Sequence, residues 1–405
     1  MKNVLVIGGG AAGMMAAYSA SYYGAKTILL EKNEKPGKKL FITGKGRCNL
    51  TNDCEPDVFF KNVISNSKFL YSAYYTFDSQ AVMRLFEEEG LELKTERGLR
   101  VFPRSDHSSD VITKLKKLLD KNNVDIHLNT VVTSIGKNKV YTTKGIFDFD
   151  ALIIATGGIS YPLTGSTGDG YKFAADMGHE IITTDAGLVP LETLGEDALR
   201  LQGLSLKNVS LTLNSGGKRL FKEQGEMLFT HFGISGPLVL SASSYLGNNI
   251  TDDTEVVIDL KPALSNEELD KRVQRDFEEF INKDFRNSLD KLLPSKMIPI
   301  IIERTGIPPE KKVHDINREE RKRLVLEIKN MSFKVKNKRP VSEAIITKGG
   351  ISTKQINPST MESKISQNIY FAGEVIDVDA LTGGFNLQIA WCTGYLAGMN
   401  AATKN

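Results

Sequence analysis

The stretch Val4-Leu-Val-Ile-Gly-Gly-Gly-Ala-Ala-Gly13 begins with an apolar run and continues with closely spaced glycines. The apolar run predicts a buried parallel strand, and Gly8, Gly10 and Gly13 fit the pattern G-x-G-x-x-G at the start of a helix. In that pattern the glycines allow a tight turn, close approach of the backbone to a pyrophosphate, and close packing of helix on strand. The helix N-terminus directs free N–H groups and a positive dipole end at the phosphates. The stretch therefore predicts a dinucleotide-binding turn.

An acidic residue follows the next predicted strand. Residues 27–30 read Thr-Ile-Leu-Leu, and Glu31 stands at the end of this strand, at roughly the 20-residue spacing of the dinucleotide pattern. A carboxylate there accepts hydrogen bonds from ribose hydroxyls and disfavours a ribose that carries a 2′-phosphate. The nucleotide expected at this first site is therefore not NADP.

The composition is that of an ordinary soluble globular protein rather than of a membrane or disordered protein. The chain has 405 residues, of which 40% are hydrophobic and 25% charged, and its formal net charge is +3. This charge is too small to indicate a polyanionic partner by itself, and no apolar run approaches the roughly 20 residues of a membrane helix. The three cysteines form no C-x-x-C pair, which favours a reducing, cytoplasmic location. We expect no metal site and no membrane partner.

Nucleotide-binding patterns stand towards both ends of the chain. A second buried strand over 151–154 runs into Thr156-Gly157-Gly158, and the last strand closes on Gly373-Glu374 before a small-residue helix over 389–401. Because the carboxyl ends of parallel strands form one ligand-binding edge, we expect these segments to meet. The predicted fold class is α/β, a Rossmann-like nucleotide-binding domain with an inserted β-barrel-like and helical domain.

The middle of the chain carries the predicted insertion. Residues 205–213 alternate between apolar and polar, as in an antiparallel strand, and Ser265 with Glu268 and Asn317 with Glu320 predict capping boxes at helix starts. The predicted boundaries are 1–187 and 341–405 for the nucleotide-binding domain, 188–262 and 332–340 for the inserted antiparallel β domain, and 263–331 for the helical subdomain.

A long loop is predicted over residues 32–52, directly after the ribose acid. Its glycines permit close backbone approach, and Arg47, Asn49 and Thr51 offer hydrogen-bond donors to a bound nucleotide. The alternative is a surface loop with solvated lysines.

Five motifs together resemble a bacterial family of FAD-dependent oxidoreductases. They are Gly44-Lys-Gly-Arg-Cys-Asn-Leu-Thr-Asn52, Gly157-Gly-Ile-Ser-Tyr-Pro162, Thr164-Gly-Ser-Thr-Gly-Asp-Gly170, Thr230-His-Phe-Gly-Ile-Ser-Gly-Pro237 and Thr382-Gly-Gly-Phe-Asn-Leu-Gln388. The family belongs to the two-dinucleotide-binding flavoprotein superfamily and includes aminoacetone oxidase-type and bile-acid enone reductase-like flavoproteins. The resemblance covers nearly the whole chain and implies a Rossmann-like FAD domain with an inserted β-barrel and helical unit. It does not identify the substrate.

The resemblance also implies which residues hold FAD. The glycine turn would bind the pyrophosphate, Glu31 the adenosine ribose, and the backbone of Val132 the adenine. The full set of expected FAD-binding residues is Gly8, Gly10, Ala12, Gly13, Glu31, Lys32, Lys39, Arg47, Asn49, Thr51, Val132, Thr156, Gly157, Gly373, Glu374, Gly384, Asn386 and Leu387. No second G-x-G-x-x-G occurs in the sequence, so NAD(P)H is left as a transient co-substrate without a domain of its own.

The expected reaction is hydride transfer between flavin N5 and a small organic substrate or NAD(P)H. The protein then has to orient the flavin and tune its electronics, and the helix that starts near Asn386 would stabilise negative charge on the reduced ring. His231 and Tyr161 are the candidate catalytic residues, each as a proton donor. The alternatives are a packing role for His231 and a backbone-supporting role for Arg47.

Three other functions remain open from the sequence. An FAD disulfide reductase would use Cys48 and Cys54, although five residues separate them, one more than that family uses. A tRNA-modifying or RNA-binding flavoprotein would use the basic segment 311–339, but four interleaved acids favour a solvated helix face there. The third is a flavin-binding sensor without turnover. A small-molecule substrate is the favoured partner, and the sequence predicts no oligomeric state.

Overall fold

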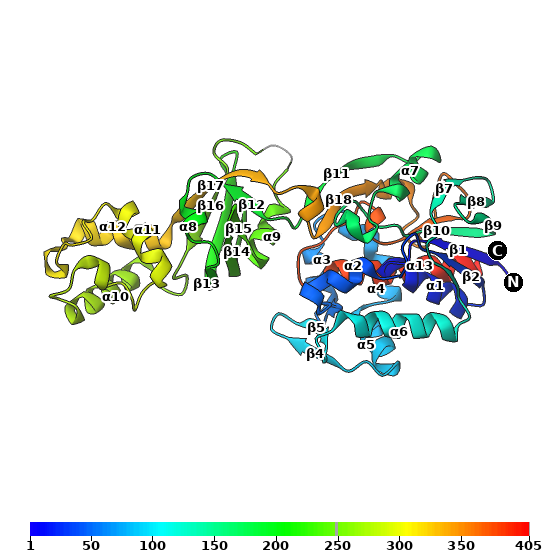
Figure 1. The fold of residues 1–405 in the computed structure, drawn as a ribbon, viewed down its shortest axis with the longest axis horizontal. Helices are drawn as coiled ribbons and strands as arrows, with labels where there is room; N and C mark the ends of the chain where they lie inside the picture. The colour runs from blue at the N-terminus through cyan, green and yellow to red at the C-terminus, as the bar shows by residue number, and fades with distance from the viewer. Residues whose placement is uncertain (248–249, 405) are drawn as a thin grey trace. The chain divides into compact units, whose positions relative to one another are not determined.

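The structure is a computed structural model and describes residues 1–247 and 250–404. It contains two compact units (Figure 1). The first, here called the discontinuous unit, comprises Met1–Gly187 and Val341–Asn405, and the second, the inserted unit, comprises Leu188–Pro340.

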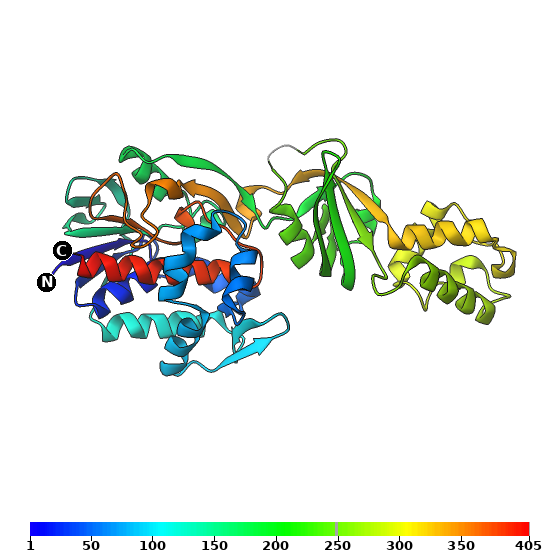
Figure 2. The ribbon, with the colours of Figure 1, turned by 180° about the vertical axis from the view of Figure 1, so that it is seen from behind.

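A five-stranded parallel sheet forms the centre of the discontinuous unit (Figure 2). Its strand order is β19-β10-β1-β2-β6, with bounds β1 (Asn3–Ile7), β2 (Lys26–Leu30), β6 (Asp125–His127), β10 (Ala151–Ile154) and β19 (Ile369–Phe371). The strands β1 and β10 are buried along almost their whole length, which explains their continuous apolar sequences. The predicted Rossmann-type α/β fold is confirmed.

Two helices from opposite ends of the chain pack against each other on this sheet. They are α1 (Ala11–Tyr22) and α13 (Phe385–Thr403). A Cβ added at Gly394 would lie 2.4 Å from the carbonyl oxygen of Ala12, and one added at Gly398 would lie 2.3 Å from that of Ala16. Side chains larger than hydrogen are therefore excluded from this helix contact, and the two backbones touch.

The remaining elements of the discontinuous unit surround the sheet. The helices are α2 (Lys38–Ile42), α3 (Pro56–Asn62), α4 (Tyr71–Thr76), α5 (Ser79–Glu88), α6 (Ser108–Lys121) and α7 (Asp169–Asp176). Smaller sheets are formed by β3 (Thr51–Asn52), β5 (Arg100–Pro103) and β4 (Leu93–Glu96), by β7 (Val132–Ile135), β8 (Lys139–Thr142) and β9 (Gly145–Asp148), and by the pair β11 (Ile181–Gly187) and β18 (Ile346–Ile351).

Two local predictions differ from the structure. The segment 32–52 was expected as a loop throughout, yet it contains α2, because Leu40 is buried and the short helix packs on α6. The C-terminal helix was expected to start at residue 389 and starts at Phe385, one turn earlier. Gly384, in the left-handed region with φ +99°, sets that earlier start.

The inserted unit is a closed six-stranded barrel with an attached group of helices. The barrel order is β12-β15-β14-β13-β16-β17, with bounds β12 (Leu191–Thr193), β13 (Ser205–Ser215), β14 (Lys218–Thr230), β15 (Gly233–Ser235), β16 (Glu255–Asp259) and β17 (Met331–Lys338). The helices are α8 (Asp197–Arg200), α9 (Pro237–Ser243), α10 (Asn266–Glu279), α11 (Ile298–Thr305) and α12 (Arg318–Lys329). Both predicted capping boxes are confirmed at the starts of α10 and α12. The unit has a hydrophobic core of its own.

Gly398→Ala should destabilise the protein although alanine favours helices. The new methyl group would overlap the Ala16 carbonyl, and overpacking of about 1–3 kcal/mol outweighs the helix-propensity gain of about 1 kcal/mol. The measurement is the denaturant midpoint of the helical circular dichroism signal. Gly247→Ala is the control, because among the described residues its methyl group meets no atom within 4 Å beyond its chain neighbours. A Gly398→Ala protein as stable as the wild type would contradict backbone contact between the helices.

Candidate active site

The N-terminal glycine turn has the geometry of a phosphate cradle. Gly8 has a φ of +106°, and a Cβ on it would lie 2.5 Å from the carbonyl oxygen of Ala155. A Cβ on Gly13 would lie 1.8 Å from the carbonyl oxygen of Gly8, whereas one on Gly10 would meet nothing within 4 Å. No side chain caps the N-terminus of α1 at Gly10. Open space and free helix N–H groups therefore coincide there, as a pyrophosphate requires.

The acid after β2 is fixed beside this turn. Glu31 is 7% exposed, and its Oε2 accepts a 2.7 Å hydrogen bond from the Gly9 N–H. Its Oε1 accepts 2.7 Å bonds from the backbone N–H and the side-chain amide of Asn33. The carboxylate is thus held in one orientation beside the glycine turn. Lys32 is engaged elsewhere, since its ammonium group pairs with Asp169 at 2.8 Å.

The segment around residue 50 lies against the C-terminal glycines. A Cβ on Gly384 would lie 2.4 Å from the carbonyl oxygen of Thr51 and 3.0 Å from Oδ1 of Asn49. The Thr51 hydroxyl donates a 2.7 Å hydrogen bond to Gln388 Oε1 in α13. The buried Oδ1 of Asn49 has no hydrogen-bond partner among the described residues. The two expected flavin-binding segments, far apart in sequence, are therefore in contact.

Arg47 belongs to a separate ion-pair cluster. Its guanidinium group donates hydrogen bonds to Glu96 and to Asp106, the latter at 2.7 Å, and lies 4.2 Å from the centre of the Phe102 ring. These contacts join the segment after α2 to β4 and β5. The side chain supports the loop, which is the alternative role considered for it.

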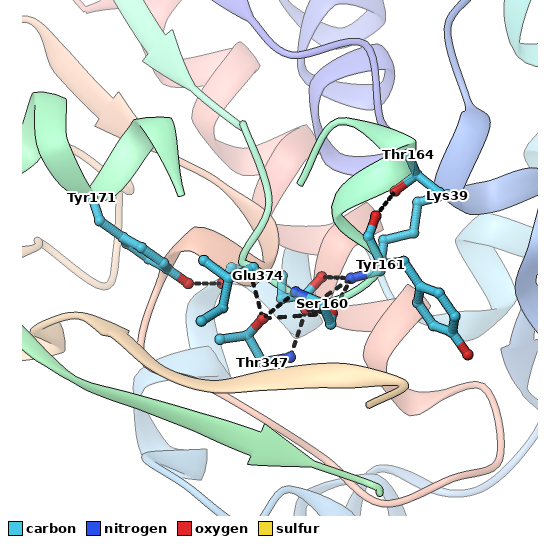
Figure 3. A network of polar contacts seen from close by, with 8 residues as sticks. Lys39, Ser160, Tyr161, Thr164, Tyr171, Thr347 and Glu374 are labelled. Atoms are coloured by element: carbon cyan, nitrogen blue, oxygen red, sulfur yellow. Dashed lines mark hydrogen bonds and ion pairs between the residues drawn. The ribbon is translucent and has the colours of Figure 1, made fainter. Parts of the chain in front are cut away.

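A polar network joins four segments that surround the carboxyl edge of the sheet (Figure 3). Lys39 lies 2.9 and 2.7 Å from the two carboxylate oxygens of Glu374 and donates a 2.6 Å bond to the Ser160 hydroxyl. The Thr347 N–H donates to Glu374 at 2.7 Å, and the Thr347 hydroxyl oxygen accepts bonds from the N–H groups of Ile159 and Ser160. The side chains of Lys39 and Glu374 are therefore satisfied by the protein itself.

Around the C-terminal glycines, the expected cofactor site is formed more by backbone than by side chains. A Cβ on Gly373 would lie 2.6 Å from Cβ of Ala12, and no side chain caps α13 at Gly384. The Asn386 side chain accepts a bond from the Ala380 N–H and donates to the carbonyl oxygens of Ala380 and Leu381. Asn386 therefore holds the preceding loop with its side chain and leaves its helix N-terminal backbone for a ligand, while Leu387 is partly buried beside it.

The other expected cofactor positions lie around the same unit. Thr156 and Gly157 follow β10, and the buried hydroxyl of Thr156 has no hydrogen-bond partner among the described residues. Val132 is the partly buried first residue of β7 and pairs with Thr142. Sequence reasoning missed Ser160 and Thr347 as parts of the site, because no motif links their hydroxyls to Glu374.

The two catalytic candidates lie on different units. Tyr161 follows Ser160 in the discontinuous unit, is partly buried and has a φ of +51°. His231 lies on the inserted unit, between β14 and β15, where it is exposed and its ring packs edge-on against Phe232 at 4.9 Å.

The cysteines have the character of core residues. All three are free and buried, and Cys48 is 0% exposed. Burial raises the pKa of the Cys48 thiol to about 12 and also raises the pKa of Cys54. A thiol that does not ionise near neutral pH is a poor nucleophile, so the structure gives the disulfide reductase alternative no support.

The described residues contain neither a candidate metal-binding cluster nor a candidate membrane-spanning helix. Among the described residues, no group of three or more His, Cys, Asp or Glu side chains could hold a metal ion. Within residues 1–247 and 250–404, no helix has the length and apolar character needed to cross a membrane.

The Lys39–Glu374 pair should be energetically coupled. Both side chains are about four-fifths buried, with 21% and 22% of their surface exposed, so losing one leaves the other poorly solvated. In a double-mutant cycle of Lys39→Met and Glu374→Gln, we expect a coupling of about 1–3 kcal/mol in the free energy of unfolding. The matched cycle is Lys38→Met with Glu34→Gln, a pair at 2.7 Å in which the Glu34 side chain is 58% exposed, and it should show a smaller coupling. Equal couplings in the two cycles would contradict a structural role for the Lys39 pair.

The cysteines should resist modification in the folded protein. Alkylation with iodoacetamide near neutral pH, followed by mass spectrometry, should leave Cys48 and Cys392 unmodified until the protein is unfolded, because both side chains are fully buried. Cys54, which is 7% exposed, should react slowly. Rapid labelling of Cys48, or loss of two thiols on mild oxidation, would support the disulfide reductase alternative, in which Cys48 and Cys54 form a redox pair.

Comparisons with known proteins agree with this site. The chain matches the model of the HI0933-like protein Rossmann domain over residues 2–400. It is 29% identical over 412 residues to the 3-dehydro-bile acid delta(4,6)-reductase of Clostridium scindens, covering all of both chains. It is 30% identical over 403 residues to the ribosomal RNA dihydrouridine synthase of Escherichia coli, covering 97% of this chain and 96% of that one.

A solved structure shares the fold. The 3-ketosteroid-delta4-(5alpha)-dehydrogenase of Rhodococcus jostii RHA1 superposes with a TM-score of 0.51 at 11% identity, covering 100% of this chain and 97% of that one. The resemblance inferred from the motifs is confirmed, and the glycine cradle with its uncapped helix N-termini fits FAD. The chain therefore belongs to the HI0933-like family of FAD-binding Rossmann proteins and is an FAD-dependent oxidoreductase.

Proposed function

We propose that this protein reduces a carbon–carbon double bond that is conjugated with a carbonyl group. The observation that carries the proposal is the chemistry shared by two relatives with different substrates. One is named for reducing the 4,6-diene of a 3-oxo bile acid, and the other for making dihydrouridine, in which a ring double bond next to a carbonyl is saturated. In both cases a hydride and a proton are added across an electron-poor alkene.

The described site supports such a reaction. Bound FAD, once reduced, supplies the hydride. The uncapped N-termini of α1 and α13 present positive dipole ends, which suit the pyrophosphate and the negative charge of the reduced ring. Lys39 and Glu374 neutralise each other and fix the loops around the cradle. The residues of the discontinuous unit thus hold and orient the cofactor, and the reaction needs in addition one group that supplies a proton.

The electron donor is proposed to be NAD(P)H acting as a transient co-substrate. The sequence has one dinucleotide fingerprint, which we propose to be taken up by FAD. A reduced nicotinamide would therefore have to visit and leave rather than occupy a domain of its own. An oxidase that is reduced by an amine and reoxidised by oxygen is the competing outcome.

A small enone is the first candidate substrate, and uridine in ribosomal RNA is the second. The second is favoured by the full-length match to the ribosomal RNA enzyme. The first is favoured by the basic segment 311–339, where cations are neutralised by acids: Lys311 pairs with Glu320 at 2.7 Å, Arg321 with Asp270 at 2.6 Å and Lys322 with Glu319 at 2.9 Å. Cations paired in this way contribute little to phosphate binding, because each must first lose its partner.

The test is anaerobic reoxidation of the reduced, FAD-loaded protein. After stoichiometric reduction with dithionite, addition of a 3-oxo-4-ene steroid should restore the yellow oxidised spectrum and yield the saturated ketone, identified by mass spectrometry. A second arm uses an unmodified ribosomal RNA transcript and looks for dihydrouridine. A third arm asks whether NADH or NADPH replaces dithionite.

Each result has a clear meaning. Reoxidation by the steroid with saturated product supports the small-molecule reductase, and reoxidation only by the transcript supports the RNA enzyme. A reduced protein that neither probe reoxidises, but that oxygen reoxidises after reduction by a small amine, overturns the proposed reaction in favour of an oxidase.

A further inference from the structure

The conjugate reduction proposed above requires a proton donor, and most polar groups of the site are already committed. Lys39, Ser160 and Glu374 bond to one another and to Thr347. Cys48 is fully covered by protein. A group that meets a substrate has to be neutral, reachable and free to donate, and these four side chains and the buried thiol do not combine those properties.

Tyr161 is neutral, reachable and free to donate a proton. Its side chain points away from the polar network (Figure 3), and no described residue accepts from or donates to its phenol oxygen. The ring is partly buried rather than fully enclosed. Burial, together with the nearby carboxylate of Glu343, raises the pKa of Tyr161 above its ordinary value, so the phenol keeps its proton at neutral pH.

The backbone of Tyr161 has an unfavourable conformation, which hydrogen bonds on both sides of the residue stabilise. Its φ of +51° lies in the left-handed region, which a bulky residue rarely adopts because its Cβ comes too close to the following carbonyl oxygen. On one side the N–H of Ser160 bonds to Thr347, and on the other side Thr164 donates two 2.8 Å bonds, from its N–H and its hydroxyl, to the Tyr161 carbonyl oxygen. Pro162 fixes the next residue. Strain that is held from both sides in this way is typical of residues with a positional role.

Asp379 is the rival acid in the same unit. Burial raises the pKa of its carboxyl group, partly offset by the Ser65 hydroxyl and by Lys348. However, Asp379 is 1% exposed, and its carbonyl oxygen is tied to the N–H of Ile64 at 2.8 Å. A substrate cannot reach this carboxyl group without displacing the loop, whereas Tyr161 already has an open side.

The geometry points to Tyr161 as the residue that donates the proton to the substrate, an inference that rests on the proposed function. In the conjugate reduction, the β-carbon of the enone accepts the hydride and the π-electron pair of the double bond moves to the α-carbon. The α-carbon takes the phenolic proton, the phenolate is reprotonated by water, and the alkene gains two electrons while reduced FAD loses two. The substrate class is a carbonyl-conjugated alkene small enough to approach the Ser160–Tyr161–Pro162 loop.

The test compares Tyr161→Phe with wild-type protein and with Tyr75→Phe, a change at a tyrosine that is 66% exposed. All are loaded with FAD, reduced anaerobically and mixed with the 3-oxo-4-ene steroid, or with the RNA transcript if that probe reoxidises the wild type. Tyr161→Phe should slow reoxidation by about 100-fold or more, the usual contribution of a general acid. Tyr75→Phe should react as the wild type does. The wild-type step should also slow in D₂O.

Three readouts separate a proton donor from a merely structural residue. FAD affinity of the apoprotein, binding of the saturated ketone to the oxidised protein, and reoxidation by oxygen should all be unchanged in Tyr161→Phe. If Tyr161→Phe is reoxidised by the enone as fast as the wild type, or if Asp379→Asn alone is slow, the inference is wrong while the proposed function stands. If neither probe reoxidises the wild type, the proposed function fails and the inference falls with it.

Discussion

The backbone contact between α1 and α13 is the constraint on which the rest of the discontinuous unit depends. Gly394 lies on Ala12 and Gly398 lies on Ala16, so the contacts advance in the same direction along both helices. The helices are therefore parallel, and their N-termini lie at the same end of the pair. Because no side chain caps either terminus, both present unpaired N–H groups where the glycine turns are found. Packing of small residues thus creates the electrostatics of the cofactor site.

The polar network around Glu374 fixes the relative positions of segments that packing alone does not determine. Loops at the ends of parallel strands lack ladder hydrogen bonds, and each could take several conformations. Lys39 in α2, Ser160 after β10, Thr347 in β18 and Glu374 after β19 bond to one another, so the segments that carry them hold one relative arrangement. The network is largely shielded from water, which strengthens its ionic member. Because Tyr161 follows Ser160 directly, this arrangement also determines the position of Tyr161.

The sequence predicted the features that depend on local spacing. The glycine pattern, Glu31 after β2, the Gly373 and Gly383-Gly384 turns and both capping boxes follow from residues a few positions apart, and the structure contains them. Contacts between distant side chains could not be predicted. Lys39 and Glu374 are 335 positions apart, and Arg47 reaches Glu96 and Asp106 across two strands, so no periodicity identifies these partners.

The discontinuous arrangement of the cofactor-binding unit has a consequence for biosynthesis. Ribosomes release the chain from its N-terminus, so the glycine turn emerges long before α13, the helix that completes it. During this interval residues 188–340 can collapse on their own core, because the barrel uses no strand from outside that range. The nascent protein is thus expected to carry a folded barrel while the parallel sheet, with four of its five strands made, still lacks β19 and the helix α13 that packs on it. Flavin capture is therefore expected only after α13 has been made, and a chain that stops before α13 would be colourless and prone to aggregate.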